Sequence, residues 1–159
     1  MGLQRRLIRI VLTPLQGLRR LLWLVTGPGK DGVHAVALTP RGAVVLVRLT
    51  YARGWRLPGG GRKRNESALE GTLRELQEEI GLLSHGEIER LETIQLRDLP
   101  GGRSELFLVR DVTYRPRRSL EIEDVREFDP ADLPGDVSET TRTVLETLAL
   151  PALRGAKGP

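Results

Sequence analysis

A spaced pattern between Gly60 and Leu82 constrains this chain more than any other feature of its sequence. Five residues separate Gly60 from Glu66, and seven more separate Glu66 from the run Arg74 to Leu82, which reads RELQEEIGL. With ordinary amino-acid usage, a random chain of this length would contain the pattern with a probability of roughly 10⁻⁶ to 10⁻⁵. The pattern therefore has to be explained by a structure or a function.

The second half of the pattern predicts a helix. Ser67 and Glu70 have the spacing of a capping box, and Gly81 is a natural helix stop, so we expect about 13 helical residues between them. Apolar residues recur along one side of this helix: Leu69, Leu73, Leu76 and Ile80. At 100° per residue, three glutamates share roughly the neighbouring third of the circumference: Glu75, Glu78 and Glu79. The sequence thus predicts a core face beside a carboxylate face.

This carboxylate face is typical of a metal site. Three carboxylates one turn apart repel one another, and a solvated helix usually relieves such repulsion with interleaved basic residues. The only basic residue in the predicted helix is Arg74, at the flank of the cluster. Oxygen ligands suit a hard divalent cation, Mg²⁺ or Mn²⁺, better than they suit a metal that prefers His or Cys. An acidic surface helix is the alternative for the three glutamates alone, but the whole spaced pattern argues against it.

The pattern from Gly60 to Leu82 resembles the Nudix box, and the preceding segment Gly54 to Gly61, GWRLPGGG, resembles the run that leads into it. The flanking strands fit too, from about Val33 to about Leu150. The resemblance implies an α/β fold, an α/β/α sandwich with a mixed central sheet. It also implies a MutT-like hydrolase that cleaves phosphoanhydride bonds in nucleoside diphosphates linked to another moiety.

The resemblance implies roles for the residues of the motif. Glu75, Glu78 and Glu79 would hold the divalent metal ions or help to activate water. Arg74 would orient these carboxylates through charge-assisted hydrogen bonds, and Glu66 would brace the loop before the helix. All signature residues are present in this chain, which argues against a non-catalytic member.

Further metal ligands are implied outside the motif. The carbonyl oxygen of Gly59 is one candidate. The acid-rich segment 119–129 resembles a stretch in which several members of the superfamily carry an additional metal ligand or the general base. Glu121 aligns best with that carboxylate, and Glu123 is second. We expect direct attack by water on phosphorus, with a helix carboxylate or Glu121 accepting the proton.

Candidates for substrate binding lie just before the predicted helix. The basic residues Arg62, Lys63 and Arg64 either contact the phosphates or form a solvated turn. Tyr51 and Trp55 flank the approach to the motif. Trp55 either stacks on a base or is a partly buried anchor, and the sequence favours the anchor.

Composition sets the remaining limits. At 159 residues, with 39% hydrophobic and 29% charged residues, the chain should form one globular domain with a normal core. The absence of cysteine excludes disulfides and thiolate chemistry and is compatible with a cytoplasmic location.

His34, one of two histidines, alternates with buried positions, so we interpret it as structural rather than catalytic.

The basic excess is confined to the N-terminal segment. Residues 1–30 hold five arginines, one lysine and no acid, so they contribute +6 to a net charge of +4 and leave −2 for the other 129 residues. The net charge therefore does not predict nucleic acid as a partner of the domain. Apolar residues at steps of three or four predict a basic amphipathic helical extension, interrupted at Pro14. It either packs on the domain or in a homodimer, lies on an anionic membrane surface, or is a flexible arm; its arginines exclude a transmembrane span.

Other elements follow from apolar runs and turn residues. Strands are predicted at 33–39, 43–49, 87–97 and 104–113, and a last helix begins near Ser138. The hydrolase domain would span 31–150, and the tail 151–159 should fray.

The substrate stays open at this level. The small size favours nucleoside di- or triphosphates, with ADP-ribose or a nucleotide sugar second. The absence of a tyrosine between Leu82 and Arg110 weighs against a diadenosine polyphosphate hydrolase, which the resemblance would otherwise allow. A non-catalytic module that binds a nucleotide for regulation is the alternative from a different class.

Overall fold

The computed structural model describes residues 31–95, 103–116 and 119–149, so the predicted extension and tail lie outside the described residues. The strands are β1 (Asp31–Ala37), β2 (Val44–Leu49), β3 (Trp55–Arg56), β4 (Gly59–Gly61), β5 (Leu82–Ser84), β6 (Ile88–Gln95), β7 (Arg103–Val109), β8 (Thr113–Tyr114) and β9 (Ile122–Phe128). The helices are α2 (Ala68–Glu79) and α3 (Glu139–Val144), and α3 continues into a π-helical turn, η1 (Leu145–Ala149).

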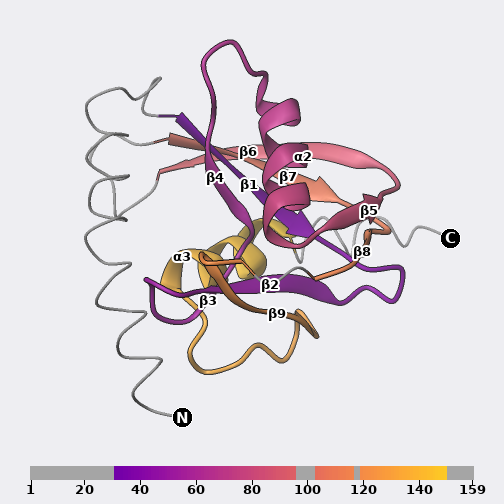
Figure 1. Cartoon of the computed structure of the whole chain (residues 1–159). Coiled ribbons are helices and arrows are strands. Elements are labelled where there is room, and N and C mark those ends of the chain that lie inside the picture. Colours follow the sequence, from indigo (N-terminus) through magenta and orange to yellow (C-terminus); the bar gives the residue numbers. More distant parts are fainter. Residues whose placement is uncertain (1–30, 96–102, 117–118, 150–159) are drawn as a thin grey trace, which may run out of the picture.

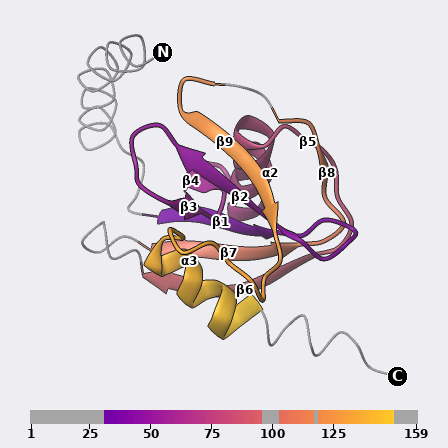
Figure 2. The same cartoon turned by 90° about the horizontal axis from the view of Figure 1, so that it is seen from below.

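The strands form a mixed α/β core, as predicted. One sheet has the order β4-β1-β7-β6, in which β1 runs parallel to β7 and the other pairs are antiparallel. A second, antiparallel sheet has the order β3-β2-β9, and β5 pairs with β8. Figures 1 and 2 show α2 on one side of the strands and α3 on the other. This is the layered arrangement that the sequence resemblance implied.

Both faces of the central strands are buried. Alternate residues of β1 enter different apolar clusters, with Val36 on the side of Leu145 and Ala35 on the side of Leu76 and Ile80. Successive side chains of a strand point to opposite faces, and a strand covered on both faces needs apolar residues at every position. The valine- and leucine-rich runs recognised in the sequence are therefore central strands.

Helix α2 begins and ends close to the predicted residues. Ser67 is the N-cap, and its side chain forms a reciprocal capping box with Glu70. The helix stops before Gly81, which has a φ of 71°. One expectation was wrong, because Leu69 is exposed instead of lying in the core stripe. The first turn packs closely through Gly71, where a Cβ atom would lie 3.1 Å from the Glu66 carboxylate, and this places Leu69 on the outer side.

Four short strands were missed by the sequence analysis. β3 and β4 occupy the segment expected only as a lead-in to the motif, and β5 and β8 pair with each other. These strands have two or three residues each, too few for a period-two pattern to stand out. Together β4 and the loop after it carry the glycine run to the N-terminal end of α2.

Candidate active site

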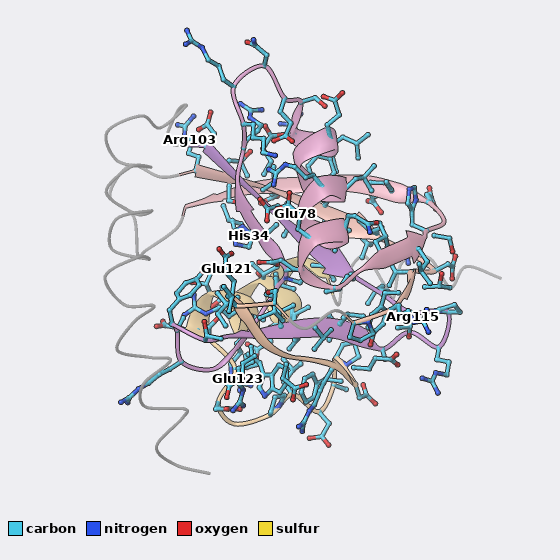
Figure 3. All side chains as sticks on the ribbon, in the orientation of Figure 1. His34, Glu78, Arg103, Arg115, Glu121 and Glu123 are labelled. Carbon is cyan, nitrogen blue, oxygen red and sulfur yellow. The ribbon has the colours of Figure 1, made fainter. Side chains whose placement is uncertain are left out.

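A cavity of about 360 Å³ lies between α2 and the residues that lead into β9. One side, here called the α2 wall, comes from the motif: Gly61, Arg62, Lys63, Arg74, Glu75, Glu78 and Glu79. The other side, the β9 wall, consists of Ser119, Glu121 and Ile122. Figure 3 labels Glu78 on α2 and Glu121 below it, and the two side chains line the same cavity. Four glutamates therefore meet at one site.

Arg74 connects most of the α2 wall. Its guanidinium donates to both carboxylate oxygens of Glu66, at 2.7 and 3.0 Å, and to the carbonyl oxygen of Gly61 at 3.0 Å. Its third nitrogen donates to Glu75 at 2.6 Å and to Glu78 at 3.3 Å. A planar guanidinium with several donors is suited to such a fork of contacts. Arg74 thus holds two candidate metal ligands in fixed positions, as the sequence analysis expected.

Glu66 anchors this arrangement from the loop side. Its carboxylate also accepts a hydrogen bond from the backbone N–H of Lys63 at 2.8 Å. The side chain is only 13% exposed, and its hydrogen bonds to Arg74 lower its pKa from 4.5 to about 2. Glu66 is therefore a mostly covered brace between the loop and α2, charged at neutral pH and outside the lining of the cavity.

Glu79 lies at the inner end of the α2 wall. It accepts a hydrogen bond from the backbone N–H of Gly59 at 2.8 Å. Burial raises its pKa to about 8, and burial also raises the pKa of Glu75. Carboxyl groups that resist ionisation in the free protein favour a cation beside them, because a positive ion offsets the cost of desolvating the charge.

The glycines of β4 make room for these carboxylates. A Cβ atom on Gly59 would lie 2.3 Å from the carbonyl oxygen of Val33, so this strand approaches β1 too closely for a side chain. A Cβ atom on Gly60 would lie 2.8 Å from the carboxylate of Glu75. The Gly59 N–H donating to Glu79 was not foreseen from the sequence, which had proposed only the carbonyl oxygen of this residue as a ligand.

The β9 wall is held through its backbone. The N–H of Thr50, at the end of β2, donates to the carbonyl oxygen of Glu121 at 2.9 Å. The Ser119 hydroxyl accepts from the N–H groups of Glu121 and Ile122, at 3.2 and 3.0 Å. Glu121 lines the cavity, whereas Glu123 is exposed and does not. Of the two carboxylates proposed beyond the motif, the structure brings only Glu121 to the cavity.

The donor set of the cavity suits a hard divalent ion. Its acidic lining side chains, Glu75, Glu78, Glu79 and Glu121, offer only carboxylate oxygens. In the part of the chain that the structure describes, no three acidic or histidine side chains yet converge as a metal centre, because Glu75 and Glu78 turn towards Arg74. The four carboxylates thus fit such an ion in their chemistry, and all of them line the same cavity.

Residues 29–148 match the family model described as NUDIX domain. The chain belongs to the NUDIX domain family. The match covers most of the chain, and with the complete motif it confirms that this is a Nudix hydrolase.

Solved structures agree with the Nudix fold. The chain is similar to a MutT NUDIX hydrolase from Burkholderia pseudomallei, with 23% identity and a TM-score of 0.63 over 73% of this chain and 95% of that one. It is also similar to an ADP-ribose pyrophosphatase from Streptococcus suis, with 22% identity and a TM-score of 0.58 over 80% of this chain and 91% of that one. A UDP-X diphosphatase shares 21% identity with this chain, with a TM-score of 0.60 over 90% of this chain and 72% of that one. A search of curated protein sequences finds no match. At these identities the structural likeness supports the fold alone.

The three consecutive basic residues of this Nudix chain differ in their position relative to the cavity. Arg62 and Lys63 line it, and Arg64 is exposed outside the lining. Arg62 is oriented by ion pairs with Glu105 at 3.4 Å and Asp31 at 3.5 Å. Two of the three basic residues therefore line the cavity, and their contact with substrate phosphates stays a prediction.

Trp55 does not belong to the cavity. It is 3% exposed and packs edge-on against Phe128, with ring centroids 4.9 Å apart. The guanidinium groups of Arg48 and Arg126 lie 4.6 and 5.5 Å from its ring centroid. We therefore remove Trp55 from the substrate-binding candidates, since core packing and arginines cover the ring that a base would need.

His34 is structural, as expected. Its Nδ1 forms a 2.7 Å hydrogen bond with the Ser104 hydroxyl across β1 and β7. Burial lowers its pKa to about 4, so the ring is neutral near pH 7.

Ser119 and Ile122 are the lining residues that the sequence did not single out, because only the pairing of β2 with β9 brings them opposite α2.

Proposed function

We propose that this Nudix hydrolase cleaves a phosphoanhydride bond in nucleoside di- or triphosphates or related nucleoside diphosphate derivatives. The observation that carries the proposal is a cavity lined by four glutamates and by three basic side chains, Arg62, Lys63 and Arg74. Carboxylates beside cations form a site for a phosphate chain together with the divalent ions that accompany it.

Glu75, Glu78 and Glu79 would hold Mg²⁺ or Mn²⁺, with Glu121 and the carbonyl oxygen of Gly59 as further ligands. The bound ion would offset charge on the phosphate oxygens and make water more acidic. In the same site, Arg62 and Lys63 would bind the outer phosphates, and Arg74 would keep Glu75 and Glu78 aligned.

The chemical step is a direct displacement. The oxygen of water forms a bond to phosphorus as the bridging P–O bond breaks, and the electron pair leaves with the departing phosphate. A carboxylate of the α2 wall or Glu121 accepts the proton of the attacking water. No phosphorylated enzyme group takes part.

ADP-ribose or a nucleotide sugar is the second candidate substrate. Structures named for activity on ADP-ribose and on UDP-X share the fold, and a fold does not choose a substrate. A non-catalytic nucleotide-binding module is the third candidate. The complete set of motif glutamates argues against it, because binding alone does not require them.

The deciding assay measures phosphate and pyrophosphate release from nucleoside tri- and diphosphates, ADP-ribose, nucleotide sugars and dinucleoside polyphosphates, with Mg²⁺ and with Mn²⁺. We expect turnover that stops with a chelator and falls at least about 1000-fold in Glu78→Gln. Glu123→Gln, an exposed glutamate outside the cavity, is the matched control. Nucleotide binding with no turnover in any arm would instead support the binding module.

The location and partners of the whole chain are part of the proposal. None of the helices among the described residues has the length and hydropathy needed to cross a bilayer. We propose a cytoplasmic enzyme whose residues 1–26 contact a second copy or an anionic membrane surface. Flotation with phosphatidylglycerol vesicles and light scattering, each with and without residues 1–30, distinguish the two contacts.

A further inference from the structure

Glu105 is a charged residue on a central strand. It lies on β7, between Val33 of β1 and Thr93 of β6, and its side chain is only 20% exposed. Phe107, two residues further along β7, belongs to the apolar cluster that includes Leu76 of α2, and side chains two residues apart share one face of a strand. Glu105 therefore points to the side of the sheet that α2 covers. A carboxylate that is mostly withdrawn from water at such a position requires a partner.

One partner of Glu105 is an arginine that lines the cavity. Arg62 lies directly after β4, and its Nη1 atom is 3.4 Å from Oε1 of Glu105, while its Nη2 atom is 3.5 Å from Oδ2 of Asp31. The backbone N–H of Arg62 also donates to the carbonyl oxygen of Asp31 at 3.3 Å, which extends the pairing of β4 with β1 by one residue. Arg62 is thus held through its backbone and through both terminal nitrogens of its guanidinium group.

A second arginine binds the other oxygen of Glu105. The Nη2 atom of Arg90, on β6, lies 2.9 Å from Oε2 of Glu105, so the two oxygens of this carboxylate bind different arginines. Arg90 is exposed and does not line the cavity, whereas Arg62 does. Together with Asp31, these side chains sum to zero formal charge. The carboxylates that orient Arg62 therefore add little repulsion against an anion in the cavity.

Holding Arg62 in advance favours the binding of an anion in the cavity. A guanidinium group has five N–H donors, and the contacts with Glu105 and Asp31 engage two of them. A flexible side chain loses conformational freedom when a ligand immobilises it, and a side chain that is already held loses less. An arginine fixed at the cavity therefore binds a phosphate more tightly than a mobile arginine of the same charge.

We propose that Glu105 is a positioning residue for the substrate, which holds the guanidinium group of Arg62 where a phosphate binds. This inference rests on the proposed function, because that function gives Arg62 a phosphate to bind. Since Glu105 lies outside the lining of the cavity, it acts through Arg62 and not on the reacting atoms. Its loss should weaken phosphate binding and leave the chemical step nearly unchanged.

Equilibrium binding tests this role independently of turnover. Calorimetry with Mg²⁺ measures the dissociation constant of methylenediphosphonate, a pyrophosphate analogue whose P–C–P bridge water does not cleave. We expect Arg62→Gln to weaken binding about tenfold, because a charged contact is lost. Glu105→Gln should weaken it about fivefold, because the ligand then has to order Arg62 itself. In a chain that already carries Arg62→Gln, Glu105→Gln should add less than about twofold, because its effect passes through Arg62.

Steady-state kinetics on the preferred substrate give a second readout. In Glu105→Gln the KM should rise about fivefold while kcat stays within about twofold, the pattern of a lost binding contact. Glu105→Asp keeps the charge but withdraws the carboxylate from a contact that is already 3.4 Å long, so we expect a similar rise. Glu127→Gln is the matched control. Glu127 also pairs with an arginine, Arg41, and is 29% exposed, but neither residue lines the cavity.

The inference is overturned if Glu105→Gln weakens binding equally with and without Arg62, since Glu105 would then act on the fold as a whole. It is also overturned if Glu105→Gln binds methylenediphosphonate as tightly as the Glu127→Gln control, or more tightly. A failure of the unmodified chain to bind this probe would count against the proposed phosphate site itself, and the inference would fall with it. Phosphate release by the unmodified chain is measured separately, so the two failures are distinguished.

Discussion

The two walls of the cavity are held in place by different parts of the chain. On the α2 wall, side chains hold side chains: Arg74 binds Glu66, Glu75 and Glu78. On the β9 wall, the hydrogen bonds hold the backbone of Glu121. A side-chain network fails when one member changes, whereas a backbone held by its neighbours accepts new side chains. The geometry of the α2 wall thus depends on its side chains, and that of the β9 wall depends on strand pairing and backbone hydrogen bonds.

Glu121 is the one residue of the β9 wall that we place in the chemistry. Glu121→Gln should lower kcat by about 100-fold, equivalent to about 2.7 kcal/mol, because a ligand or base is lost. Glu123→Gln should change kcat by less than about twofold. Steady-state kinetics on the preferred substrate measure both. A loss in Glu121→Gln as large as that in Glu78→Gln would show that both walls carry the chemistry equally.

Glu66, which braces the α2 wall, should make the free energy of unfolding depend on pH. Because folding lowers the pKa of Glu66 from 4.5 to about 2, its contribution is present above pH 4.5 and is lost as the pH falls towards 2. Glu66→Gln should therefore cost about 2 kcal/mol of unfolding free energy at pH 7 and clearly less at pH 3.

Urea unfolding at the two pH values measures this difference, with the exposed Glu92→Gln as the control. A cost of Glu66→Gln that does not change with pH would mean that its charge is not what braces the wall.

A smaller effect is expected where the α2 wall meets β4. In Gly60→Ala the new methyl group would lie 2.8 Å from the Glu75 carboxylate, so Glu75 has to move. We expect kcat to fall about tenfold with little change in stability, since a displaced catalytic group costs rate before it costs folding. Gly135→Ala, where a Cβ atom meets nothing within 4 Å, is the control. Unchanged kcat in Gly60→Ala would show that Glu75 tolerates displacement.

The smallest effect concerns the start of α2. Ser67→Ala removes the cap and should cost about 1 kcal/mol of unfolding free energy. Thermal or urea unfolding measures it beside Glu66→Gln. If Ser67→Ala is the more costly of the two, the helix cap and not Arg74 determines how firmly the α2 wall is held.

The α2 wall was predictable from the sequence because its information is local. Capping by Ser67, the stop at Gly81 and the spacing of Glu75, Glu78 and Glu79 all lie within one helix and its ends. The resemblance to the Nudix box added Glu66 and Arg74, whose mutual contact spans only eight residues. A helical period and a cap are enough to place such side chains on a common face.

The β9 wall was not predictable in the same way. Its relation to α2 depends on the pairing of β2 with β9, whose partners Val44 and Phe128 are far apart in the sequence. The sequence identified Glu121 only through resemblance, and it gave no signal for Ser119 or Ile122. For Trp55, the sequence favoured an anchor over a stacking role, and the packing against Phe128 agrees with the anchor. Long-range strand pairing leaves no local signature of this kind.

The position of Arg74 has a consequence for the protein before any cation arrives. Its positive charge already neutralises part of the acidic cluster, so the cluster has a resident counterion within the fold. Small domains whose structural metal supplies the folding energy unfold when it is removed. Here a bound ion would compete with Arg74 for the carboxylates of Glu75 and Glu78, and Arg74 would offset their charge in its absence. Metal supply would then switch catalysis on and off without exposing the protein to unfolding or degradation.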